Sequence, residues 1–339
     1  MQKLVLMIAT LGMALTAHAE WTAQADVPRT RAEHDAVLVG DKIYVLSGLN
    51  ENQNTGPSEI DRYDPATDTW NAAYGTMSRN KNHSGVVAYQ DRYIVLVGGK
   101  TAGPTTGVRW VDQYDTVNNT WSQLPDLPTT VWAAPAVMVG NYVHIFSGAV
   151  NNSNSATHHF RLNLQNPSSG WESMADIPTA VVHAGAVVFN NMVYLIAGET
   201  RHSHPSNGQL GIVQIYNPAT NQWSSGPNIP IARNHIETSV FVYDNKIWSV
   251  TGVDSSNNPR GQDEVLTFDG NSWADAEMDL PEKKVGASAL ATNDTLFVMG
   301  GWVNTWIPSN LTRRTYAYVL NDTSPPAPRP EAPIDFLVE

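Results

Sequence analysis

The fold is decided by residues 34–70, which read HDAVLVGDKIYVLSG over 34–48 and EIDRYDPATDTW over 59–70. Short runs of β-branched and aromatic residues alternate here with turn residues, and no run shows the period of an amphipathic helix. The pattern predicts four strands, over about 34–39, 42–46 and 59–63 and from Trp70 onward. The Asp-Pro-Ala-Thr-Asp segment at 64–68 is typical of a turn that an aspartate side chain stabilises. These residues therefore predict one four-stranded antiparallel sheet.

The same pattern recurs along the whole chain. Tryptophans return at intervals of 49 to 52 residues, at Trp21, Trp70, Trp121, Trp171, Trp223 and Trp273. Strand-like runs end in glycine in phase with them, at Gly48, Gly99, Gly148, Gly198, Gly252 and Gly301. A four-stranded sheet repeated at a period near 50 residues predicts an all-β ring of six sheets.

Repeats in which a glycine-ended strand is followed by tyrosine and then tryptophan resemble those of the kelch family. The resemblance covers residues 20 to about 320 and implies a six-bladed β-propeller over residues 20–321. The last repeat starts at Trp273, and its third strand-like run, RTYAYVL at 314–320, has no tryptophan after it. We therefore expect the N-terminal segment Glu20-Trp21-Thr22 to pair with this run and close the ring, which would leave no open sheet edge.

The two ends of the chain differ in composition from the repeats between them. Lys3, an apolar run over 4–16 and the Ala-His-Ala sequence at 17–19 predict a signal peptide over residues 1–19. We therefore expect a protein that is periplasmic or secreted, with no membrane anchor. Residues 322–339 are rich in proline, so we expect a mobile C-terminal tail.

Composition excludes several classes of function. The chain has 20 Lys and Arg against 32 Asp and Glu, a net charge of −12, which argues against nucleic acid as a partner. It has no cysteine, and no nucleotide-binding fingerprint is present. The short histidine clusters His158-His159 and His202-x-His204 lack a third ligand at a telling spacing. We therefore expect no cofactor and no metal.

In a propeller, the segments that precede each first strand and those that follow each second strand meet at one mouth of the central channel. Counting eight residues back from the second strands places Glu33, His83, Ala133, His183, Glu237 and Gly286 in one ring. Histidines and glutamates in such a ring suit acid–base chemistry, or they hold neighbouring loops together. The predicted ligand-binding residues from these segments are Arg31, Glu33, His34, His83, Trp132, His235, Glu237 and Trp302.

The fourth repeat contains the sequence AGETRHSHP at 197–205. A glutamate directly after the glycine, with an arginine near it, resembles the bacterial N-acetylneuraminate epimerases (sialic-acid mutarotases), which are exported six-bladed kelch proteins. The resemblance implies catalytic roles for Glu199 and Arg201, and His183 is placed to act with them. Those enzymes carry the arginine further along and have a long insertion that the even spacing here lacks. A loop ion pair explains Glu199 and Arg201 equally well.

Three functions remain open on the sequence alone. The first is an exported propeller that binds a small polar ligand, a carbohydrate or a sugar acid, at the channel mouth. The second is an isomerase that acts at the anomeric centre of such a sugar, as a mutarotase or epimerase does. The third is a module without enzymatic activity that binds another protein.

Overall fold

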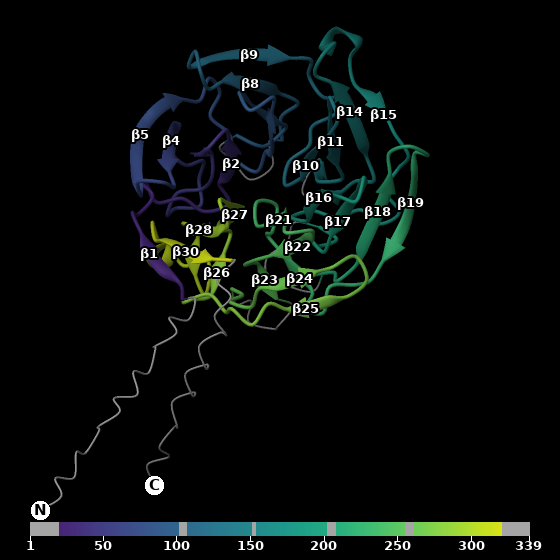
Figure 1. Ribbon diagram of the computed structural model, residues 1–339. Coiled ribbons are helices and arrows are strands. Elements are labelled where there is room, and N and C mark those ends of the chain that lie inside the picture. Colours follow the sequence, from purple (N-terminus) through teal and green to yellow (C-terminus); the bar gives the residue numbers. More distant parts are fainter. Residues whose placement is uncertain (1–19, 102–106, 151–153, 202–207, 255–260, 321–339) are drawn as a thin grey trace, which may run out of the picture.

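A computed structural model of the chain describes residues 20–101, 107–150, 154–201, 208–254 and 261–320. Six four-stranded antiparallel sheets lie around a central axis (Figure 1), which confirms the predicted six-bladed propeller. No helix among these residues is long and apolar enough to cross a membrane. The predicted signal peptide at 1–19 and the proline-rich tail at 322–339 lie outside the described residues.

Blades 1 to 5 order their strands from the axis outward along the chain, and blade 6 does so for its first three strands and takes the N-terminal β1 as its fourth. Blades 1 to 3 comprise β2(Asp35–Val39), β3(Lys42–Leu46), β4(Glu59–Asp64) and β5(Thr69–Thr76); β6(Gly85–Tyr89), β7(Tyr93–Val97), β8(Val111–Asp115) and β9(Thr120–Leu124); and β10(Ala136–Val139), β11(Tyr142–Phe146), β14(His159–Asn163) and β15(Glu172–Ser173). Blades 4 to 6 comprise β16(Gly185–Phe189), β17(Met192–Ile196), β18(Val213–Asn217) and β19(Gln222–Gly226); β21(Val240–Tyr243), β22(Lys246–Ser249), β24(Leu266–Phe268) and β25(Trp273–Asp275); and β27(Ser288–Thr292), β28(Thr295–Met299), β30(Thr315–Val319) and β1(Thr22–Gln24).

Short ribbons and single turns complete the described structure. Three two-residue ribbons join β12(Ala149–Val150) to β13(Asn154–Ser155), β20(Arg233–Asn234) to β23(Val253–Asp254), and β26(Lys284–Val285) to β29(Trp302–Val303). Two 3₁₀ turns, η1(Pro167–Ser169) and η2(Pro308–Asn310), lie in loops.

The turns follow from the residues at them. In blade 4 the hairpin between the two inner strands is Asn190-Asn191, and both residues have positive φ, 49° and 60°, as a two-residue type I′ turn requires. Between the third and fourth strands an Asx side chain accepts from the backbone: Asp64 Oδ1 accepts from the Ala66 N–H at 3.1 Å, and Asn217 Oδ1 from the Ala219 N–H at 2.9 Å. The predicted Asx turn is therefore correct.

The repeat tryptophans join neighbouring blades. The indole N–H of Trp121 donates to the Thr76 carbonyl at 2.8 Å, and that of Trp223 donates to the Ala175 carbonyl at 2.9 Å. Each acceptor belongs to the preceding blade, and each ring also packs on an aromatic residue of its own third strand, such as Tyr114 under Trp121. The ring is closed at the other end by β1, which pairs antiparallel with β30.

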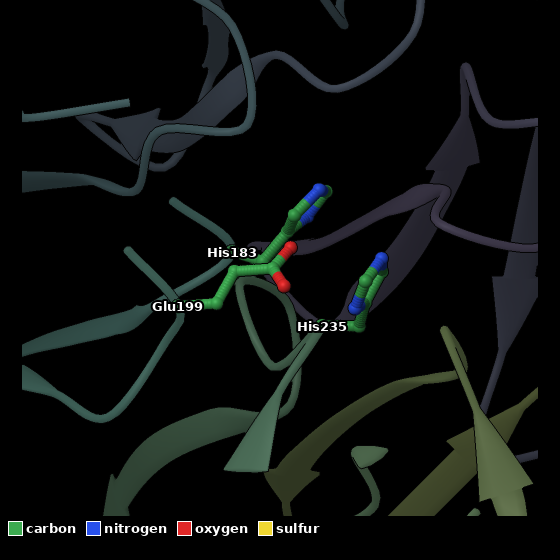
Figure 2. Close-up of side chains that lie close together, drawn as sticks. All are labelled: His183, Glu199 and His235. Atoms are coloured by element: carbon green, nitrogen blue, oxygen red, sulfur yellow. The ribbon is translucent and has the colours of Figure 1, made fainter. Parts of the chain in front are cut away.

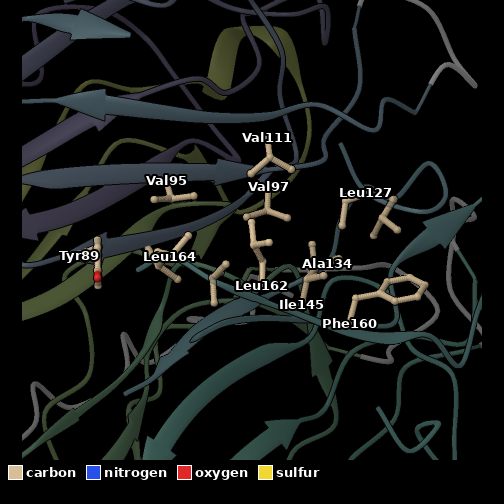
Figure 3. Packing of buried hydrophobic residues seen from close by; sticks show 13 residues of the cluster. Tyr89, Val95, Val97, Val111, Leu127, Ala134, Ile145, Phe160, Leu162 and Leu164 are labelled. Atoms are coloured by element: carbon tan, nitrogen blue, oxygen red, sulfur yellow. The ribbon is translucent and has the colours of Figure 1, made fainter. Parts of the chain in front are cut away.

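Closure by the N-terminal strand is confirmed, although its extent differs from the sequence expectation. The paired residues are Thr22–Gln24, opposite Ala317, Tyr316 and Thr315, rather than Glu20–Thr22. Apolar contacts between blades fill the space around the ring. Figure 3 shows one such cluster, in which Val95 and Val97 of β7 and Val111 of β8, in blade 2, pack near Ile145 and Leu162 of blade 3. The packed ring of blades determines the positions of the loops at the channel mouth.

Candidate functional site

In each blade, the segment that leads into the inner strand contains a residue with a left-handed backbone conformation. These residues form the axial ring, with φ between 48° and 57°: Glu33, His83, Ala133, His183, His235 and Gly286. Backbone bonds link successive members, such as Ala133 N–H to the His83 carbonyl at 2.9 Å and His183 N–H to the Ala133 carbonyl at 3.0 Å. The sequence count was wrong in blade 5, where it gave Glu237. The ring residue there is His235, because blade 5 has two extra residues before its inner strand.

A short backbone bridge brings Glu199 to this ring. Val182, the residue before His183, pairs with Glu199 through two hydrogen bonds of 2.9 Å. Gly198 makes this close approach possible, since its φ is 94° and a Cβ there would lie 2.7 Å from the Val182 carbonyl oxygen. The glycine that ends the second strand therefore delivers Glu199 to the channel mouth.

Glu33 lies between two histidines of the ring. Its carboxylate is 2.5 Å from Nε2 of His83 and 3.4 Å from Nε2 of His235. Burial alone would raise the pKa of Glu33, but the attraction of His83, His235 and His183 overrides burial and holds this pKa well below its usual value. Glu33 is thus the ionised carboxylate of the site.

His183 and His235 stack face to face, with 3.8 Å between ring centroids and 14° between ring planes. Nδ1 of His183 contacts Oε1 of Glu237. Nδ1 of His235 lies 2.9 Å from Oδ1 of Asn234, whose side chain also hydrogen-bonds Glu199. Figure 2 shows the Glu199 carboxylate beside the two rings. The cluster therefore contains a third carboxylate, that of Glu237, which like Glu199 is not a member of the axial ring.

The other two carboxylates differ from Glu33. The pKa of Glu199 is raised to about 8, because burial and the nearby carboxylates of Glu237 and Glu33 outweigh the Asn234 hydrogen bond, which lowers it. Burial also raises the pKa of Glu237 to about 7, although His235 lowers it. The site therefore holds one ionised carboxylate beside two whose charge the surroundings disfavour.

An aromatic wall borders the cluster. Trp132, one residue before Ala133 of the ring, meets His83 edge to face at 5.6 Å, and the ammonium of Lys100 lies 4.5 Å from the centre of its ring. Beside the cluster, the side chains of Glu33, Asp35, His83, Ser84, Glu237 and Thr238 leave room for about one water molecule. A larger ligand therefore has to bind at the mouth.

The structure brings together seven of the predicted site residues: Glu33, His83, Trp132, His183, Glu199, His235 and Glu237. The remaining four lie elsewhere. Arg31 is buried inside blade 1, where its guanidinium donates to Asp61 Oδ2 at 2.9 Å and to the Glu59 carbonyl at 2.8 Å. These contacts join the segment before the inner strand to the third strand of blade 1. In blade 2, Lys81 has the equivalent position, and its ammonium lies 3.0 Å from the Asp112 carboxylate.

His34, Trp302 and Arg201 also lie outside this group, although Trp302 pairs with Val285, next to Gly286 of the axial ring, as Glu199 pairs with Val182. Burial, helped by Arg31 and Lys284, lowers the pKa of His34 to about 3, so this ring is neutral inside the wall of the propeller. Trp302 is buried in an apolar cluster with Val253 and Val285. Arg201 is exposed, and among the described residues no ion pair joins it to Glu199. The loop ion pair considered from the sequence is therefore absent from the described residues, and a catalytic role for Arg201 stays a prediction.

Four contributors were not predicted as site residues: Asn82, Lys100, Asn234 and Trp306, whose indole meets His235 edge to face at 5.2 Å. Both asparagines come directly before a ring histidine and accept from its Nδ1, at 2.5 Å for His83 and 2.9 Å for His235. The Asn-His dipeptides at 82–83 and 234–235 are the signal in the sequence that marks them.

Comparison with known proteins agrees with this architecture. A family model described as the kelch motif matches residues 30–73, 83–128 and 180–230. This chain is a kelch-repeat propeller. The kelch propeller is 25% identical to Kelch-like protein terF of Aspergillus terreus over 283 residues, 80% of this chain and 50% of that protein. It is 27% identical to Kelch-like protein 38 of Homo sapiens over 252 residues, 68% of this chain and 37% of that protein.

Beta-scruin of Limulus polyphemus is 27% identical over 135 residues, 38% of the kelch propeller and 14% of that protein. The chain thus spans half the length or less of these curated relatives. Among solved structures, that of YjhT superposes with a TM-score of 0.68 at 12% identity, covering 87% of this chain and 96% of that one. At this identity the likeness shows the fold alone.

Proposed function

We propose that the kelch propeller is exported and binds a small polar ligand, a carbohydrate or a sugar acid, at the axial cluster. The carrying observation is the convergence of three glutamates and three histidines at one mouth: Glu33, His83, His183, Glu199, His235 and Glu237. The apolar sequence at 4–16 with its Ala-His-Ala end supports export.

The chemistry of the cluster suits polyhydroxylated ligands. The carboxylates accept hydrogen bonds, and the imidazoles can donate or accept them. A sugar has several adjacent hydroxyl groups, each of which needs such a hydrogen-bond partner. The side chains of Glu199 and both stacked histidines are nearly excluded from solvent, at 3% exposure for Glu199, 0% for His183 and 4% for His235. Hydrogen bonds made here are therefore poorly screened and strongly directional. Lys100, on the ring of Trp132, supplies a cation for an acidic ligand.

The first experiment is a thermal-shift screen of neutral monosaccharides and sugar acids on the chain from residue 20 onward. A ligand that binds only the native state raises the melting temperature. We expect a hit whose shift is lost in Glu33→Gln and retained in Glu172→Gln, an exposed carboxylate paired with Arg161. A hit that shifts Glu33→Gln as much as wild type would place the binding site elsewhere and contradict the proposal.

A second candidate function is exchange of anomers, as a sugar mutarotase performs. It is favoured by the position of the Glu199 carboxylate, which has donor atoms of both His183 and His235 within 4.8 Å. In this reaction Glu199 takes the proton of the anomeric hydroxyl, a histidinium gives a proton to the ring oxygen, and the bond from the anomeric carbon to the ring oxygen breaks. Closure on the other face of the carbonyl returns both protons and yields the other anomer.

NMR of the interconversion of α and β anomers tests this candidate on sialic acid and common hexoses. We expect the wild type to accelerate interconversion, and Glu199→Gln, which keeps the shape of the side chain, to slow it by about 100-fold or more. Glu172→Gln should match the wild type. If the wild type accelerates no tested sugar, anomer exchange fails for those sugars, whereas the thermal-shift result decides ligand binding independently.

A further inference from the structure

We propose that His183, Glu199 and His235 form a binding site for a divalent transition-metal ion of the Zn²⁺ type. Each side chain offers one ligand atom, and these atoms all lie within 4.8 Å of one another. Figure 2 shows the two imidazole rings side by side with the carboxylate of Glu199 next to them. Two imidazoles and one carboxylate are a ligand set that transition metals favour over Mg²⁺ and Ca²⁺, which prefer oxygen ligands.

The outer contacts of the histidines are those of metal ligands. A histidine that binds a metal donates its other ring N–H to a carboxylate or carbonyl oxygen, which fixes the tautomer and the ring orientation. His183 contacts Glu237 through Nδ1, and His235 contacts the Asn234 amide oxygen through Nδ1. Metal binding through Nε2 would keep both Nδ1 contacts, and on His235 it would replace the ionic contact with Glu33, which lies 3.4 Å from Nε2. Asn234 also hydrogen-bonds Glu199, so one amide orients two of the three ligands.

The charges of the pocket favour a cation. Glu33, Glu199 and Glu237 bring three carboxylates into one buried cluster, with side-chain exposures of 8% for Glu33 and 18% for Glu237. Buried carboxylates are stabilised by pairing or by metal coordination. Lys100 lies at the edge of the cluster, on Trp132. A divalent ion bound by Glu199 would place a positive charge beside these buried carboxyl groups.

The geometry requires only small side-chain movements. Ligands that share one tetrahedral ion at about 2.1 Å lie about 3.3 Å from one another. The donor atoms here are at most 4.8 Å apart, so the three side chains would have to move closer to one another to share one ion. Three protein ligands leave at least one coordination position open, and the proposal stands whether or not a sugar binds.

The test is a calorimetric titration of EDTA-treated protein, from residue 20 onward and without a histidine tag, with Zn²⁺. We expect one tight site per chain. Glu199→Gln should weaken binding by more than about 100-fold, and Asn234→Ala, which removes an orienting contact, by about 10- to 100-fold. His202→Ala/His204→Ala is the matched control, since that short histidine motif is another source of zinc affinity and its loss should leave the tight site intact.

Co²⁺ as a second probe keeps the result independent of heat effects, because histidine coordination gives Co²⁺ a visible d–d spectrum. The spectrum should appear in wild type and in the control variant and should be absent from His183→Gln, whose fold is checked by its melting curve. The proposal is overturned if Zn²⁺ binds wild type and Glu199→Gln equally, if no tight site is found, or if binding disappears only in His202→Ala/His204→Ala.

Discussion

The indole N–H of Trp21 donates to the carbonyl of Met278 at 3.4 Å, although 257 residues separate them. Five other repeat tryptophans make the same bond to the preceding blade, as Trp171 does to the Pro125 carbonyl at 2.8 Å. Trp21 therefore has in blade 6 the role that each later tryptophan has in its own blade. The N-terminal segment closes the ring through a side chain as well as through the strand pairing of β1 with β30.

Deleting residues 20–24 should open the ring. The deletion removes both the strand opposite Thr315–Ala317 and the bond to Met278, so the outer edge of blade 6 becomes unpaired and prone to association. We expect insolubility or a large fall in melting temperature, measured by calorimetry against a chain that lacks residues 335–339 instead. Equal melting curves for the two truncations would contradict N-terminal closure.

The inter-blade tryptophans should contribute to stability rather than to binding. Trp121 is half-buried, packs on Tyr114 at 4.9 Å and donates to the Thr76 carbonyl. Trp121→Phe keeps the packing and should cost about 1 kcal/mol for the lost hydrogen bond. Trp121→Ala should cost about 3 kcal/mol, the lower end for a buried aromatic, because part of the ring is exposed. Denaturant unfolding measures both, and two variants as stable as wild type would refute this role.

Asp35 should make stability fall as pH rises. It is 2% exposed at the start of β2, and burial raises its pKa to about 8 against the attraction of Lys81. Because the unfolded chain loses this proton near pH 4 and the native state only near pH 8, the unfolding free energy falls between these values by up to about 1.4 kcal/mol per pH unit.

Asp35→Asn removes this dependence and should become progressively more stable than wild type from pH 5 to pH 8. Thermal or urea unfolding at several pH values measures the difference. Asp126→Asn, at an exposed carboxylate, is the control and should show no such trend. A constant difference between Asp35→Asn and wild type across this range would contradict the pKa of Asp35.

Most of the fold could be predicted because three local signals repeat along the chain. The glycine after the second strand and the tryptophan recur in all six blades, and the Asx turn recurs in the five blades whose third and fourth strands are consecutive in the chain. Their period gives the number of blades and the strand order. The predicted second strand at 42–46 is β3 to the residue. The extent of β1 was less predictable, because pairing with β30 rather than any local signal determines it.

The site could be predicted only in part, because it depends on how loops from different blades meet. The ring position was correct where blades keep the same length and wrong in blade 5, where two extra residues shift it from Glu237 to His235. Arg31 had the charge of a binding residue, but its partner Asp61 lies in its own blade. The contact of Lys100 with Trp132 and that of Asn234 with Glu199 depend on neighbours that no sequence spacing places beside them.

Two-dimensional NMR of isotope-labelled histidine rings, recorded while sugars and sugar acids are added, tests the central claim most directly. His83, His183 and His235 lie in the axial cluster, whereas His144 and His159 form a buried pair in blade 3, 2.8 Å apart between ring nitrogens, and serve as controls within the same molecule. The account predicts that a binding ligand shifts the three axial signals and leaves the blade 3 pair unchanged. A ligand that binds tightly yet leaves all three axial signals in place would contradict it.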